Sequence, residues 1–146
     1  MAQSPPAAFK SESFPPEVQK SLQNARSECR RAGGTGLTFA PDTVRKIDLT
    51  GDGRDDYIVT LRDTVCKERE HIYCGTGGCA LAIFVARKGG GFRNVFSDQA
   101  HEYEILPGSG ARTIRFSLHH GHCDGATGRT GCSKERKITD KSFSFR

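Results

Sequence analysis

Cysteine constrains this chain more than any other residue type. Six cysteines occur among 146 residues, and two pairs lie close in sequence, Cys74 with Cys79 and Cys123 with Cys132. An even number of cysteines in a short chain is typical of a disulfide framework in an oxidising compartment. Zinc sites and thioredoxin-like sites use C-x-x-C spacing, which no two cysteines here have. We therefore expect disulfides, and a periplasmic or secreted protein of bacterial type.

The pairing of the cysteines is open on sequence alone, because six cysteines can be joined in many ways. We favour the two local pairs as loop staples. That choice leaves Cys29 to join Cys66 and to tie an N-terminal helix to a sheet. Loops of these lengths contribute about 2 to 4 kcal/mol each in the chain-entropy model. We expect reduction to unfold the protein, because the sum rivals the stability of a typical domain.

The chain has the length of one domain. Residues 1–15 are rich in Pro and Ser and predict a disordered lead-in, and residues 16–146 predict a single disulfide-stabilised, β-rich domain. Met1-Ala2 fits an added initiator before a mature N-terminus, so we expect that an export signal has been removed. Seventeen glycines, six prolines and the absence of Trp favour short elements over a helical bundle. No apolar run of about 18 residues predicts a membrane span.

One helix is predicted near the N-terminus. Pro15-Pro16 suits a first helical turn, where proline is tolerated. Four apolar residues then recur at helical spacing: Val18, Leu22, Ala25 and Cys29. Gly33-Gly34 supplies the left-handed residue that favours a helix end. We expect Cys29 to face inward at the end of this helix.

The rest of the chain has the patterns of short strands. The predicted strands are 37–40, 45–49, 57–62, 80–87, 92–96, 103–106, 113–119 and, as a last edge strand, 141–146. Glycine-rich segments at 88–91 and 107–110 predict two hairpin connections. The sequence therefore predicts an α+β fold, mainly antiparallel β, with one N-terminal helix packed on roughly six or seven strands.

The most specific motif is an aspartate-rich loop. Calcium takes oxygen ligands, which binding loops supply from positions 1, 3, 5, 7 and 9. Here those positions are Asp48, Thr50, Asp52, the carbonyl of Arg54, and Asp56. Gly53 stands at position 6, where such a loop turns sharply. The bidentate Glu of an EF-hand is missing at position 12, and a predicted strand rather than a helix follows.

This loop between two predicted strands resembles the calcium loops of integrin-type FG-GAP repeats, over about residues 44–60. The resemblance implies that the carboxylates of Asp48, Asp52 and Asp56 hold calcium. With Thr50 at one ligand position, we expect weak affinity, roughly 10⁻⁵ to 10⁻³ M. The alternative is an Asp-Gly hairpin turn that needs no metal. The crowding of four aspartates into this segment weighs against that alternative, because like charges repel without a cation.

A second metal-type pattern is His119-His120-Gly121-His122. On a strand, His120 and His122 would share a face, as a pair of zinc or copper ligands requires. His101 or Asp124 could serve as a third ligand. The alternative, which we favour, is a solvent-facing strand end before a disulfide loop, because a third ligand is not fixed by the sequence. Zinc or copper binding is therefore not expected.

No residue set predicts an active site. Gly75–Gly78 lacks the Gly-Lys-Ser/Thr of a phosphate loop, and no Gly-x-Ser-x-Gly occurs. Glu102 and Glu104 share a strand face, which is a weak glycosidase signal.

The sequence favours a non-enzymatic binding or structural module of the cell envelope, with calcium as the expected ion. Alternatives are a metal-handling protein or hydrolase that uses His119–His122, and an inhibitor of a secreted hydrolase. The net charge of +5 is spread along the chain, which does not favour nucleic-acid binding. The expected partner is an unknown protein or envelope component, and the oligomeric state is open.

Overall fold

The computed structural model describes residues 13–123 and 131–145. Most of the predicted lead-in therefore lies outside the described residues. Helix α1 spans Pro16–Arg31 and buries Val18, Leu22, Ala25 and Cys29, which are the four residues that the sequence periodicity selects. Gly33 follows with a φ of 92°, a left-handed conformation that favours glycine after a helix. No helix in these residues is long and apolar enough to cross a membrane.

The largest sheet has β6 at its centre. Its strands are β2 (Val44–Ile47), β3 (Asp56–Thr60), β5 (Cys74–Gly75), β6 (Gly78–Ala86) and β7 (Phe92–Ala100), all in antiparallel pairs. β3 and β5 pair with successive parts of one side of β6, and β7 pairs with the other side. β2 ends the sheet beyond β3.

A second antiparallel sheet has three strands in the order β10-β9-β8. These are β8 (Glu102–Ile105), β9 (Thr113–Leu118) and β10 (Cys132–Lys137). β8 follows β7 almost directly, so the chain passes from one sheet to the other near His101. A short 3₁₀ helix (His120–His122) follows β9, and a small ribbon pairs β1 (Leu37–Thr38) with β4 (Val65–Cys66).

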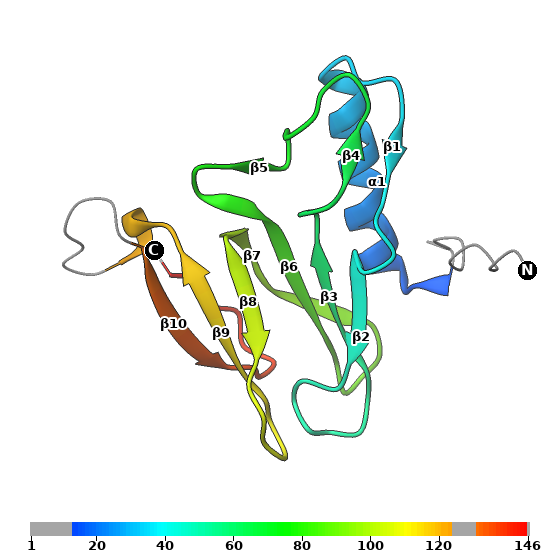
Figure 1. Cartoon of the computed structure of the whole chain (residues 1–146). Helices are drawn as coiled ribbons and strands as arrows, with labels where there is room; N and C mark the ends of the chain where they lie inside the picture. Colours follow the sequence, from blue (N-terminus) through cyan, green and yellow to red (C-terminus); the bar gives the residue numbers. More distant parts are fainter. Residues whose placement is uncertain (1–12, 124–130, 146) are drawn as a thin grey trace, which may run out of the picture.

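Both faces of the large sheet are buried, against different partners. On one face α1 packs on Tyr57, Val59 and Phe84. On the other face a second core gathers residues from both sheets, among them Ile58, Leu81, Ile83, Val85, Ile114, Phe116 and Leu118. Successive residues of β3 and β6 thus face opposite cores, as the strand period of two requires. The layers run from α1 through the large sheet to the three-stranded sheet (Figure 1).

The predicted fold class is confirmed, and so are both predicted hairpins, β6–β7 and β8–β9. The prediction of the last strand was wrong. β10 spans Cys132–Lys137, whereas residues 141–145 form no strand. Phe143 and Phe145 of this tail nevertheless pack into the core, where they contact the rings of Phe96 and Phe116.

Candidate functional site

The aspartate loop connects β2 to β3, and the pair Ile47↔Asp56 closes it. Gly51 and Gly53 have φ of 79° and 85°, so the loop turns through two left-handed residues, one of them at the predicted position 6. Leu49 is fully buried and anchors the start of the loop in the core between the sheets. The predicted strand–loop–strand arrangement is therefore the one observed.

Backbone N–H groups organise two of the predicted ligand side chains. The carboxylate of Asp48 accepts hydrogen bonds from Gly51 N and Gly53 N, both at 2.8 Å. The carboxylate of Asp52 accepts from Arg54 N at 2.9 Å, and this bond is the main reason that the pKa of Asp52 lies below its ordinary value. Arg54 Nε lies 3.3 Å from Asp52 Oδ2, and its Nη1 donates to the Arg87 carbonyl at 2.8 Å.

Asp56 is the buried member of the set, with no exposed surface. Its Oδ2 accepts from Leu49 N at 2.7 Å and from Thr50 N at 3.3 Å, and its Oδ1 accepts from Ala86 N at 2.8 Å. All three donors are neutral, and no cationic side chain pairs with Asp56 within residues 13–123 and 131–145. Burial raises the pKa of Asp56 despite these hydrogen bonds, and the nearby charge of Asp52 raises it further.

Thr50 stands at the predicted position 3. Its Oγ1 is buried and makes no hydrogen bond of normal geometry within the described part of the chain. The hydroxyl lies close enough to Asp52 to contribute to the lowered pKa of that carboxyl. A hydroxyl that donates toward Asp52 keeps its lone pairs, so Thr50 Oγ1 retains acceptor capacity inside the loop.

The donor chemistry of the loop fits calcium. Carboxylate, hydroxyl and carbonyl oxygens are the ligands that this hard cation takes. Each carboxylate offers about four lone-pair positions, so the N–H bonds to Asp48 and Asp56 leave acceptor capacity on both. The side chains are not gathered around one point, however. Among the described residues, no three His, Cys, Asp or Glu side chains form a group that could hold a metal ion.

The disulfides join the cysteines in the favoured pairing. Cys29 at the end of α1 bonds Cys66 of β4, and both residues are buried. Cys74 and Cys79 are opposite each other in the β5–β6 pair, and Cys123 bonds Cys132 at the start of β10. Three disulfides mark the protein as extracytoplasmic.

The histidines gather at the end of β9. The ring of His119 lies 3.9 Å from that of His120 and 6.3 Å from that of His101, between centroids. Loss of solvent and the neighbouring histidines hold the pKa of His119 below its ordinary value. The expectation that His120 and His122 share a strand face was wrong, because β9 ends at Leu118 and both lie in the 3₁₀ helix. Asp124 lies outside the described residues.

His119 is a poor metal ligand as placed. Its Nδ1 accepts a hydrogen bond from Gly121 N at 3.1 Å, so the neutral ring carries its proton on Nε2. A metal-ligating histidine usually donates from the nitrogen that does not bind the metal. The histidine rings do lie close together, but the hydrogen bond at His119 favours a structural turn over a zinc or copper site.

No protein-family model matches the chain, and the comparisons with curated proteins and with solved structures give no match. The functional inference therefore rests on the residues of this chain.

Proposed function

We propose that this chain is a non-enzymatic periplasmic or secreted binding domain in which the loop Asp48–Asp56 binds calcium. The observation that carries the proposal is the carboxylate of Asp56, which is fully buried and faces only neutral donors. A buried charge without a counter-charge is unfavourable. A divalent cation held with Asp52 would lower that electrostatic cost and would offset the repulsion between the two carboxylates.

Thr50 favours calcium over a plain Asp-Gly hairpin turn. Its hydroxyl oxygen is buried inside the loop, and the calcium pattern assigns an oxygen ligand to this position. All the candidate ligands are oxygens, which suit calcium better than zinc or copper. The resemblance of the loop sequence to FG-GAP loops, which remains a prediction, agrees with a calcium site.

The bound ion would stabilise the β2–β3 hairpin. Asp56 bonds both the start of the loop at Leu49 and the end of β6 at Ala86. An ion on this carboxylate would therefore couple the loop to the central strand of the large sheet. The binding surface that the ion stiffens would include β2 and β3.

Thermal unfolding in millimolar calcium and in EGTA tests the proposal. A ligand that binds only the folded state stabilises it by RT ln(1 + [L]/Kd), about 2.7 kcal/mol at 100-fold excess over Kd. At roughly 2–4 °C per kcal/mol for a chain of this size, we expect the midpoint to rise by several degrees at the tight end of the expected affinity range and by about 1 °C at the weak end. Magnesium at the same concentration should shift it much less, because that ion demands strict octahedral geometry.

Two single-residue variants of the same loop make the test specific. Asp52→Ala removes a predicted ligand and should abolish the calcium shift. Asp55→Ala makes the same chemical change at an exposed position that the ligand pattern omits, where Lys46 lies 3.9 Å away. It should keep the full shift. The absence of a shift in the unmodified protein, or an equal shift in both variants, would reject the calcium site.

A metal-handling protein based on His119–His122 is the second candidate, since the structure brings His101 to the same cluster. Elemental analysis of the purified protein separates the two proposals. Stoichiometric zinc or copper would favour the histidine cluster, and calcium alone would favour the aspartate loop.

A further inference from the structure

A groove of about 730 Å³ runs between β8 on one side and β2 and β3 on the other. Leu81 of β6 and Ala100 at the end of β7 are among the apolar residues that line it. In Figure 1 the order β10, β9, β8 continues past β6 to β3 and β2, so β8 is the strand of the small sheet nearest the groove. The three-stranded sheet thus leaves part of the large sheet's face accessible.

β8 presents a free edge to this groove, because β9 is its one strand partner among the described residues. Leu106 N donates to Thr113 O across the ladder. In an antiparallel pair, alternate residues bond to the partner strand. Tyr103 and Ile105 therefore direct their backbone N–H and C=O groups away from β9. These groups form a template for one more strand.

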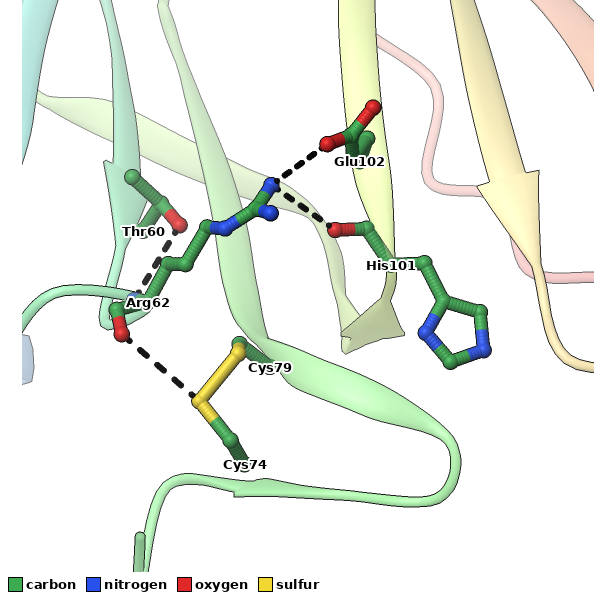
Figure 2. The surroundings of a disulfide bond; sticks show 6 residues. All are labelled: Thr60, Arg62, Cys74, Cys79, His101 and Glu102. Carbon is green, nitrogen blue, oxygen red and sulfur yellow. Dashed lines mark hydrogen bonds and ion pairs between the residues drawn. A yellow bond between two sulfur atoms is a disulfide. The ribbon is translucent and has the colours of Figure 1, made fainter.

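An arginine from across the groove already bonds to this edge. Figure 2 shows Arg62, just after β3, reaching to the carbonyl of His101 and to the side chain of Glu102. Its Nη1 donates to His101 O at 3.2 Å and to Glu102 Oε1 at 3.0 Å. Half of the Arg62 side chain is exposed, at 50%, so an exposed pair of this kind is weak and can be displaced. The guanidinium occupies an acceptor that the N–H of an added strand could use.

The side chains of β8 specify what such a strand should carry. Tyr103 and Ile105 pack toward the core, whereas Glu102 and Glu104 are exposed on the opposite face. Residues beside them on an added strand would alternate in the same way, apolar inward and polar outward.

The negative charge of the groove favours basic residues at the outward positions of an added strand. The groove lining holds four carboxylates and two arginines, a net −2 with histidine neutral, whereas the whole chain carries +5. Asp42 and Asp63 are exposed on the rim formed by β2 and β3. Neither forms an ion pair with a described side chain. On the β8 rim, Glu102 pairs with Arg62 and Glu104 with Arg115. A partner with outward lysine or arginine would therefore complement the rim that carries Asp42 and Asp63.

From these features we infer that the groove binds an extended peptide segment of a partner protein, added as a fourth strand on β8, with apolar and basic residues in alternation. Backbone hydrogen bonds to an exposed edge give such binding its affinity, and alternate side chains give it specificity. The inference rests on the binding role proposed above and names its site and partner class. It does not depend on calcium.

The probe is a synthetic peptide, Val-Lys-Val-Lys-Val, with fluorescein on its N-terminus and an amide at its C-terminus, and its binding to the full chain is followed by fluorescence anisotropy. We expect saturable binding. The same peptide with N-methylated central residues cannot donate its backbone hydrogen bonds and should bind much more weakly. A peptide with Glu in place of Lys should also bind weakly. Absence of saturable binding, or equal binding of the N-methylated peptide, would overturn the inference.

Variants of the chain locate the site. Asp42→Lys with Asp63→Lys reverses two exposed rim charges and should weaken the Lys peptide roughly tenfold while improving the Glu peptide. Glu70→Lys with Asp140→Lys makes the same change in net charge at exposed positions outside the groove and should have little effect. Equal effects of the two double variants would show non-specific attraction and would overturn the inference.

Ile105→Pro tests the strand edge itself. Its N–H faces away from β9, so proline removes no bond of the β8–β9 ladder but blocks an added strand. We expect peptide binding to be lost and cooperative unfolding to be retained.

Sedimentation of the unmodified protein tests whether a second copy of the chain occupies this strand edge instead. A dimer that this variant dissociates would assign the edge to a second copy and overturn the inference. The calcium shift in thermal unfolding is a separate readout, so the two proposals can fail independently.

Discussion

Asp56 has a structural role that its position in the loop pattern does not reveal. Its carboxylate links the start of the aspartate loop to the end of β6, thirty residues further along the chain. The sequence pattern selects Asp56 as a ligand from its position in the loop. The bond to Ala86 depends on the register of β6 beside β3, which local sequence does not encode. The carboxylate of Asp56 is therefore buried with hydrogen bonds to both of its oxygens, but no cationic side chain of the described residues pairs with it.

The titration of Asp56 provides a residue-scale prediction. In EGTA its pKa should lie above the ordinary value of 3.8, because burial disfavours the ionised form. The folded state then binds the proton more tightly than the unfolded chain. This stabilising contribution is fully present below pH 3.8 and is lost as the pH rises through the folded-state pKa.

Bound calcium should reverse that shift, because a nearby cation favours the carboxylate. Carboxyl-carbon NMR titrations in EGTA and in calcium measure both pKa values. A pKa at or below 3.8 in EGTA would show that the buried charge is already compensated. The central observation for a calcium site would then be lost.

At the scale of elements, the predictions from periodicity were the most successful. α1 and the hairpins β6–β7 and β8–β9 follow patterns that span many residues and end at glycine or proline. β10 was missed because Ser133–Lys137 is mostly charged and has no apolar face. It is a strand because all six of its residues pair with β9. Tertiary pairing here overrides a weak local preference.

The candidate sites also differ in how far local sequence predicts them. The aspartate loop could be found from sequence, because its candidate ligand positions and its glycine are local. The groove beside β8 could not, because Arg62 and Glu102 are forty residues apart and only the fold brings them together. The histidine cluster was half predicted. Its members were identified, but the strand was extended past Leu118, and so the geometry was wrong.

Packing between two loops gives a prediction at the scale of elements. Gly51 and Gly53 both have positive φ, but a Cβ on Gly51 would lie 2.5 Å from the Gly110 backbone carbon in the β8–β9 turn, whereas a Cβ on Gly53 would meet nothing within 4 Å. Gly53→Ala should cost about 1 kcal/mol for the left-handed backbone alone. Gly51→Ala should cost roughly 1–3 kcal/mol more, because the two loops must separate.

Urea unfolding of the two alanine variants in EGTA measures the difference. Both substitutions add the same methyl group to the same loop, so the contact with Gly110 is the main variable between them. Equal destabilisation would mean that the aspartate loop is not packed against the β8–β9 turn. The hydrogen bond from Arg112 N to Leu49 O, at 2.7 Å, would then be in doubt as well.

At the scale of the whole molecule, stability is divided among two cores and three disulfides. α1 buries Val18 and Leu22 against one face of the large sheet, and the three-stranded sheet covers the other face only in part. A sheet covered in part gains less from apolar burial than one covered in full. The disulfides add stability that burial does not supply, because they join α1 to β4, β5 to β6, and the segment after β9 to β10.

Reduction should therefore unfold the protein, and calcium should not prevent it. In the chain-entropy model the Cys29–Cys66 link, 37 residues apart, contributes about 4 kcal/mol, and the two shorter links about 2–3 kcal/mol each. Their sum is comparable with the whole stability of a typical domain, about 5–15 kcal/mol. A calcium ion at 100-fold excess over its Kd contributes about 2.7 kcal/mol, which is too little to replace them.

Urea unfolding followed by far-UV circular dichroism, with and without a reductant and with and without calcium, tests whether the disulfides stabilise the fold more than calcium does. We expect the reduced protein to lose its cooperative transition in both EGTA and calcium, and the oxidised protein to keep it in both. A reduced protein that still unfolds cooperatively would mean that the two cores suffice. The accessible face beside β8 would then be a feature that the fold tolerates without disulfides, and the disulfides would serve to resist local opening of the loops.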